Sequence, residues 1–255
     1  MWQALRTELH PLGVEIVTVS LELSGPEASR PFIDAARPEH PSLLDPTHQL
    51  DALFGVVNIP NVIWIDEAGM IVRPPEPGWP GTTVYPESMR AMLIERARQA
   101  AEAPPSDTPK PNLAAVLQGG QDRAAYPDAI RDWATNGSAS TYAMTPDHVI
   151  AASQPRSLSS SQAAAHFELA NHFWRSGERD AAIHHFNECH RLQPDNWTYK
   201  RQAWSLVGNE RAGGGEMGRF SQVPVAGEEA DWPFASNFDA DVAQLQPGEY
   251  YPNTM

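Results

Sequence analysis

Hydrophobic and polar positions alternate along the first third of the chain in a way that predicts helices and strands in turn. Apolar residues recur at helical spacing over residues 2–10, which predicts an amphipathic helix. Residues 14–21 (VEIVTVSL) are apolar at nearly every position, as expected of a strand covered on both faces. A helix around residues 29–37 and a brief strand at 41–46 follow. This alternation predicts a sheet with parallel central strands covered by helices.

Residues 50–73 (LDALFGVVNIPNVIWIDEAGMIVR) carry the most informative pattern in this part of the chain. The first of them end a helix for which Asp45 is the expected N-cap, and a turn containing Ile59 and Pro60 comes next. The apolar run at 62–65, a turn of Asp-Glu-Ala-Gly and a second apolar run then predict a β-hairpin.

Pro-rich and Gly-rich segments separate the next predicted elements. Residues 74–87 are expected to form a loop, and a helix is expected over 88–103. A Pro-rich linker over 104–111 then leads to two shorter helices at 126–136 and 146–152.

Residues 163–196 resemble one tetratricopeptide repeat, a helix–turn–helix unit that stacks on its neighbours. Residues 197–207 are expected to form a capping helix or the first helix of a degenerate second repeat, and the helices within 124–152 are candidates for a packing neighbour. From residue 208 onward the chain is irregular, and its aromatic residues are expected to hold it against the body. The positions that carry the resemblance are Leu169, Ala170, Phe173, Gly177, Ala182, Phe186, Leu192 and Pro194.

Composition narrows the classes of function. The 255 residues include 24 prolines and are 41% hydrophobic, which favours ordered domains joined by Pro-rich connectors over one compact body. A net charge of -14 argues against nucleic acid as the main partner. No apolar run is long enough for a transmembrane helix and the N-terminal residues lack the layout of a signal peptide. If Met1 is the true start, the expectation is a cytoplasmic protein with no membrane partner.

The order of elements over residues 1–75, with Ile59 and Pro60 just ahead of the hairpin, resembles the second half of a thioredoxin-like domain of the TlpA/ResA (AhpC/TSA-related redoxin) family. The expected fold class is α/β: a thioredoxin-like sheet, incomplete at the N-terminus, joined to an all-α C-terminal domain with the tetratricopeptide-like repeat. The family's final helix corresponds either to residues 86–102 or to 124–136. The expected domains are the thioredoxin-like domain (1–103), a linker with short helices (104–160), the repeat with its cap (161–207) and an irregular tail (208–255).

The resemblance also implies a function and a set of site residues. Members of the family are thiol–disulfide oxidoreductases or peroxidases that act on a protein thiol or disulfide, and no cofactor is expected. The resemblance implies that Pro60 is a cis-proline and that Ile59 and Pro60 contact the substrate. Glu22, just past the first strand, lies near an active-site glutamate of the ResA-like proteins. The alternative for Glu22 is a solvated carboxylate at a strand end.

The catalytic cysteine segment of the family has no counterpart in this chain. The single cysteine, Cys189, excludes an intrachain disulfide or a C-x-x-C pair, and its place in the repeat predicts a buried structural thiol. The chain as given is therefore expected to be inactive in thiol chemistry, and whether the protein is an enzyme stays open. No Ser-His-Asp order, Walker loop or G-x-G-x-x-G segment offers another chemistry.

Two explanations account for the missing segment. In the first, Met1 is the true start and the chain is a redox-inactive scaffold that binds a protein partner through its repeat. In the second, an upstream UGA codon for selenocysteine was taken for a stop. The chain is then part of a selenol–disulfide oxidoreductase or peroxidase, in which Trp2 is a packing residue.

The repeat contains five histidines, namely His166, His172, His184, His185 and His190. His184 and His185 are adjacent on a helix and point to different faces, so they cannot chelate a metal ion together. Solvated helix faces are the preferred interpretation, and no metal site is expected.

Overall fold

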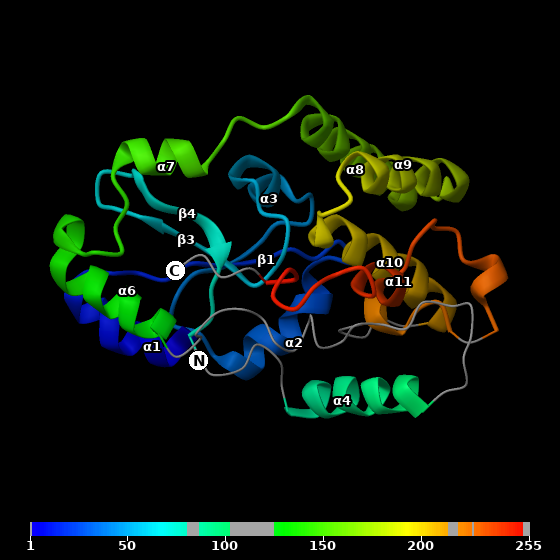
Figure 1. Cartoon of the computed structure of the whole chain (residues 1–255), viewed down its shortest axis with the longest axis horizontal. Coiled ribbons are helices and arrows are strands. Elements are labelled where there is room, and N and C mark those ends of the chain that lie inside the picture. The colour runs from blue at the N-terminus through cyan, green and yellow to red at the C-terminus, as the bar shows by residue number, and fades with distance from the viewer. Residues whose placement is uncertain (1, 81–86, 103–124, 214–218, 226, 252–255) are drawn as a thin grey trace. The chain divides into compact units, whose positions relative to one another are not determined.

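The computed structural model describes residues 2–80, 87–102, 125–213, 219–225 and 227–251 of the chain. The chain forms two compact units, whose elements are labelled in Figure 1. The first unit comprises residues 1–84 and 122–157, and the second comprises residues 85–121 and 158–255.

These units divide the chain at different places from the expected domains. Helix α4 (Glu87–Glu102), expected in the thioredoxin-like domain, groups with the second unit, where its Arg96 binds both carboxylate oxygens of Asp239 at 2.7 Å. Helices α6 (Ala125–Asn136) and α7 (Pro146–Ala152), expected in the linker and as neighbours of the repeat, group with the first unit. Long-range packing, which no local pattern encodes, decides these memberships.

The first unit contains two small sheets and the helices around them. Strands β1 and β2 form a parallel pair, and β3 and β4 form an antiparallel hairpin. The elements that precede α6 are α1 (Trp2–Leu9), η1 (His10–Leu12), β1 (Thr18–Ser20), α2 (Pro26–Ala36), β2 (Ser42–Leu44), α3 (Gln49–Phe54), β3 (Asn61–Ile65) and β4 (Ile71–Pro77), and η2 (Gly137–Ala139) follows α6. The predicted alternation of helices and strands and the predicted hairpin are therefore both present.

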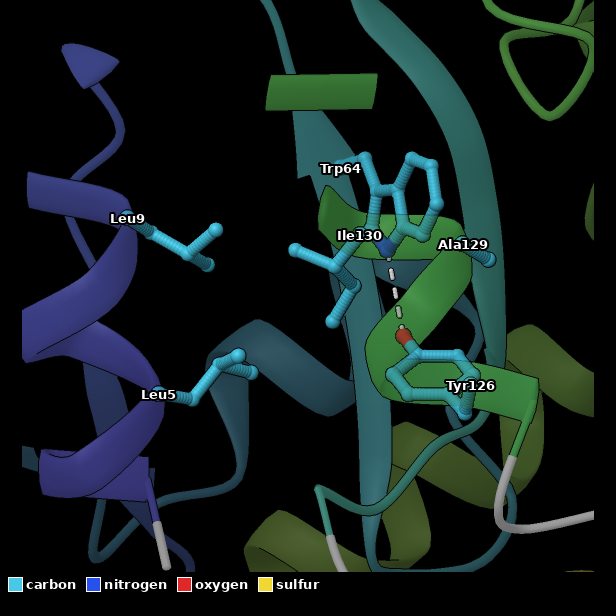
Figure 2. Packing of buried hydrophobic residues seen from close by; sticks show 6 residues of the cluster. All are labelled: Leu5, Leu9, Trp64, Tyr126, Ala129 and Ile130. Carbon is cyan, nitrogen blue, oxygen red and sulfur yellow. Dashed lines mark hydrogen bonds between the residues drawn. The ribbon is translucent and has the colours of Figure 1, made fainter. Parts of the chain in front are cut away.

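One cluster of buried side chains joins α1, β3 and α6 (Figure 2). Trp64 of β3 is 3% exposed, and its Nε1 donates a hydrogen bond to the Tyr126 hydroxyl at 3.1 Å. Trp133 stacks on Trp64 with 5.1 Å between ring centroids. Leu5 and Leu9 of α1 close the cluster from the opposite side (Figure 2). Of the two helices considered as the last of this unit, α6 is therefore the one that packs with the hairpin.

Strand β4 runs further than the sequence suggests. A loop is predicted over residues 74–87, whereas β4 continues to Pro77 and places Glu76 opposite Val62 of β3. Glu76 and Arg73 are buried in this strand and join through two hydrogen bonds of 2.6 and 2.7 Å. Because a buried ion pair leaves no apolar pattern, hydrophobicity could not reveal this part of the strand.

The parallel pair β1–β2 is covered on one face only. Val19 lies opposite Leu43 in the ladder, and these side chains are 37% and 49% exposed. Val17, two residues before Val19, is 53% exposed. The expectation of a strand over 14–21 covered on both faces is therefore wrong twice, because the strand spans Thr18–Ser20 and one of its faces meets solvent.

Helix α2 presents a polar side chain to this sheet. The helix begins at Pro26, earlier than the expected start near residue 29, so Pro31 lies in its interior. Ser29 is the buried residue of α2, and its Oγ lies 2.8 Å from Oγ of Ser20 in β1. Phe32 of the same helix is 52% exposed. The hydrogen-bonded contact between α2 and the sheet is therefore polar.

The second unit is built on a helical hairpin. Helices α8 (Leu158–Ser176) and α9 (Arg179–Leu192) are joined at Gly177, whose φ of 86° suits glycine. Ala170, Ala182 and Phe186 are fully buried between the helices, whereas Leu169 is 43% exposed. The predicted helix–turn–helix over 163–196 is therefore present, with an earlier start. The other elements of this unit are α4, α10 (Trp197–Ala212), η3 (Arg219–Gln222), η4 (Glu229–Asp231) and α11 (Phe238–Val242).

The C-terminal tail packs on α10, as its aromatic residues predict. Tyr250 is 2% exposed and meets Trp197 edge-on with 4.7 Å between ring centroids. Lys200 of α10 binds Asp241 at 2.6 Å. Across the described part of the chain, no helix combines the length and apolar character that crossing a membrane requires.

Candidate functional site

The segment that leads to Ile59 and Pro60 gathers buried polar side chains. They come from the end of β2, from the start of α3 and from the turn after α3. Buried polar groups need partners, so their hydrogen bonds define the local geometry. These side chains, each between 1% and 7% exposed, are Asp45, His48, Asp51 and Asn58.

Asp45 organises the start of α3, but it is not the predicted N-cap. The helix begins at Gln49, and His48 occupies the N-cap with a left-handed φ of 57°. Asp45 instead reaches across the turn, where its Oδ2 accepts a hydrogen bond from the Leu50 amide at 2.7 Å. Its Oδ1 accepts a hydrogen bond from the Thr47 hydroxyl at 3.3 Å. The carboxylate thus satisfies a free amide of the first helical turn from outside the helix.

His48 and Asp51 form a buried pair across the first turn of α3. Nδ1 of His48 lies 2.8 Å from Oδ2 of Asp51. A carboxylate that holds one imidazole nitrogen in this way also orients general bases in enzymes. Here both side chains are 1% exposed, so a substrate in solution cannot reach them. The pair therefore stabilises the turn rather than performing chemistry.

Ile59 and Pro60 lie at the end of this segment, directly before β3. The peptide bond between them is cis, which confirms what the resemblance implied for Pro60. Oδ1 of Asn58 accepts a hydrogen bond from the Ile59 amide at 2.9 Å and so holds the turn. Ile59 and Pro60 are both partly exposed, so another polypeptide can touch them.

Glu22 lies between β1 and α2. Its Oε1 accepts a hydrogen bond from the Ser24 amide at 2.8 Å, and its backbone carbonyl accepts one from the Gly25 amide at 3.4 Å. These contacts close the turn that starts α2. They support the strand-end interpretation of Glu22 over a catalytic one.

Cys189 lies inside the helical hairpin of the second unit. Its side chain is fully buried, at 0% exposed, and is not part of a disulfide. A buried thiol in apolar surroundings is inert toward disulfides and peroxides. The thiol therefore has a packing role. Cys189 also belongs to a different unit of the chain from Ile59 and Pro60.

The structure pairs two of the histidines across the hairpin, a contact that local spacing could not show. Nδ1 of His166 on α8 lies 2.8 Å from Nδ1 of His185 on α9. Burial first, and then the charges of His166 and His184, lower the pKa of His185. His190 lies apart from this pair, buried beside Trp204. Among the described residues, no group of three or more His, Cys, Asp or Glu side chains has the arrangement to hold a metal ion.

Comparisons with protein-family models, with curated proteins and with solved structures found no match for this chain. The functional conclusion therefore rests on the geometry of the described residues. Two features were missed at the level of sequence: the open apolar face of β1–β2 and the His166–His185 pair. Both depend on residues that come together only after folding.

Proposed function

We propose that this chain is a protein-binding module and that the open face of the β1–β2 pair is its contact surface. The observation that carries this proposal is the exposure of Val17, Val19 and Leu43 on one face, which we call the β1–β2 outer face. Apolar side chains grouped on a sheet surface are a common feature of protein interaction sites.

The outer face of this sheet is apolar, whereas the face toward the chain is mixed and carries hydroxyl groups beside Leu44. Side chains alternate along a strand, so Thr18 and Ser20 point away from Val19. Thr18 meets Ser42 at 3.0 Å between hydroxyl oxygens, and Ser20 meets Ser29 of α2. Hydroxyl groups are thus covered by the chain itself, while the branched apolar residues meet water. A sheet that leaves an apolar face in water gains from an external partner on that face.

The lack of a usable thiol favours binding over redox chemistry. The one cysteine of the sequence, Cys189, is fully buried. The buried dyad His48–Asp51 is likewise closed to solvent. The proposed scaffold therefore consists of the first unit with its outer face and the helical hairpin, which we keep as a further proposed docking element for a protein partner.

A photo-crosslinking experiment tests the proposed surface. The crosslinking amino acid p-benzoylphenylalanine is placed at Val19 or, as a control, at Ile150, an apolar residue of α7 that is 71% exposed. In the cells that make the protein, we expect an adduct with a partner protein at Val19 only. That adduct should be lost when Leu43→Glu is added, because the charge lies beside Val19 in the ladder. Equal adducts at both positions, or none at Val19, would refute the proposal.

Redox chemistry is the second candidate function. Its support is the place of the Ile59–Pro60 turn, which precedes the hairpin as the TlpA/ResA resemblance requires. On this proposal the chain works with a Cys- or Sec-bearing segment that it does not itself contain, as a thiol or selenol–disulfide oxidoreductase or a peroxidase. On either proposal, we expect neither the parent chain nor its Cys189→Ala variant to reduce insulin disulfides or consume peroxide above background, because the one thiol is buried. Activity that depends on Cys189 would overturn the burial argument and the scaffold proposal together.

A further inference from the structure

Two imidazole rings on the helical hairpin face each other across neighbouring helices. Nδ1 of His166 and Nδ1 of His185 are 2.8 Å apart, and the ring centroids are 5.0 Å apart. For this contact one Nδ1 carries the hydrogen and the other accepts it, so at least one ring is neutral. Two ring nitrogens from different helices therefore converge on one small region of space.

Neighbouring aromatic rings fix the orientation of this pair. Phe173 of α8 stacks on His185 with 5.5 Å between ring centroids and an angle of 5° between the ring planes. His184 meets His185 edge-on at 5.1 Å. A site whose rings are held before the ligand arrives loses less entropy on binding.

We propose that His166 and His185 together bind a divalent transition-metal ion, with water completing its coordination. Metal–nitrogen bonds of about 2.0–2.1 Å at a tetrahedral angle place two nitrogens roughly 3.3 Å apart. The observed separation is 2.8 Å, so a side-chain shift of about half an ångström converts the hydrogen-bonded pair into a chelating one. Both histidines are partly exposed, so an ion and its waters can enter.

The charges around the pair suit a cation. Glu188 lies one turn beyond His184 and His185 on α9, and its carboxylate interacts electrostatically with His166 and His184. Arg191 binds this carboxylate at 2.7 Å. Glu188 therefore acts on the ion through its negative charge and is not a direct ligand. Nitrogen ligands of this kind bind Cu²⁺ more tightly than Ni²⁺ or Zn²⁺.

Calorimetric titration of the untagged, EDTA-treated chain with CuCl₂, NiCl₂ or ZnCl₂ tests the site. We expect one saturable site that binds Cu²⁺ more tightly than Ni²⁺ or Zn²⁺. His166→Ala or His185→Ala alone should weaken binding at least about tenfold, because a direct ligand contributes no less than a supporting partner does. The double variant should be little worse than either single variant, since each already destroys the chelate. His172→Ala, an exposed histidine of α8, and His148→Ala should bind like the parent protein.

A second pair of variants and a spectroscopic measurement complete the test. His166→Gln and His185→Gln replace the alanine variants if circular dichroism shows that those do not fold. In electron paramagnetic resonance, Cu²⁺ should couple to two imidazole nitrogens in the parent protein and to one or none in each single variant. Absence of saturable binding would overturn the proposal, and so would binding that survives in both single variants. Neither outcome bears on the β1–β2 outer face, which lies in the other unit.

Discussion

At the scale of single residues, His190 shows how burial sets the state of a side chain. The ring is 7% exposed and lies beside Trp204 and Phe234, at 6.2 and 5.4 Å between ring centroids. Burial first, and then the charge of Lys200, lower the pKa of His190 to about 3. The folded protein therefore holds a neutral imidazole at any ordinary pH. A proton there would place a charge among aromatic rings, which is unfavourable.

This pKa predicts how stability depends on pH. The ordinary pKa of histidine is about 6.5, so His190 takes up a proton in the unfolded state well before it does in the folded state. We expect its contribution to the free energy of unfolding to be full above about pH 6.5 and to be lost as the pH falls toward 3. At about pH 4.5 the loss is about 2–3 kcal/mol, since each pH unit is worth about 1.4 kcal/mol.

Urea unfolding at about pH 7.5 and about pH 4.5 measures this effect. Carboxylates also titrate in that range, so the comparison is made against His190→Leu, which carries no titrating group at this position. The variant should lose less stability on acidification than the parent protein does. An equal loss in both proteins would mean that His190 titrates normally in the fold.

At the scale of elements, β4 shows how a polar pair can extend a strand. Arg73 binds both carboxylate oxygens of Glu76 and donates to the Tyr142 carbonyl at 2.8 Å. The guanidinium also lies 5.4 Å from the ring centroid of Trp64. The pair thus connects β4 to β3 and to the segment before α7. Its loss should therefore destabilise the hairpin and not only one side chain.

We expect Glu76→Gln to lower the free energy of unfolding by about 3–5 kcal/mol, because it leaves the buried charge of Arg73 without its carboxylate. Chemical denaturation with tryptophan fluorescence measures the change, since Trp64 lies in the same hairpin. Asp128→Asn is the matched control: it breaks the exposed Arg131–Asp128 pair, whose side chains are 44% and 75% exposed. That control should cost no more than about 1 kcal/mol. Similar costs for the two variants would show that the β4 pair is not effectively buried.

Elements with a regular apolar period were predictable from the sequence. The hairpin of α8 and α9 follows from helical periodicity with Gly177 between the helices, and the β3–β4 hairpin follows from two apolar runs around turn residues. The cis bond before Pro60 was predictable only through the family resemblance. In these regions the local pattern alone sets the type of element, although not every apolar residue of the pattern is buried: Leu169 is 43% exposed and Ile65 is 46% exposed.

Elements shaped by long-range contacts were not predictable in this way. The apolar pattern of residues 14–21 predicts a strand covered on both faces. That prediction failed because the pattern does not tell which elements will pack against the strand. The continuation of β4 was hidden because its buried residues are Arg73, Pro74 and Glu76, none of which marks a strand by its hydrophobicity. The His166–His185 pair joins residues from two helices, so spacing within either helix gives no indication of it. The candidate surfaces are therefore the part of the molecule that only the fold reveals.

At the scale of the whole molecule, an excess of negative charge is the dominant electrostatic feature. The chain has 32 acidic and 18 basic residues, for a net charge of -14. Local pairs offset part of this excess: Arg6 binds Glu15 at 2.7 Å and lowers the pKa of that carboxyl to about 2. Exposed pairs of this kind contribute little each. Repulsion among the excess carboxylates acts over longer distances and destabilises the compact state.

We therefore expect the melting temperature to rise when NaCl is raised from about 10 mM to about 150 mM at about pH 7.5. The Debye length falls from about 30 Å to about 8 Å over that range, which screens repulsion between distant carboxylates. Differential scanning fluorimetry measures the shift. The internal control is the same comparison at about pH 5.5, which lies below the ordinary histidine pKa of about 6.5, so the net charge is less negative there. The salt effect should shrink there, because less repulsion remains to be screened. A melting temperature that falls with salt at about pH 7.5 would show instead that attractive surface pairs outweigh the net charge.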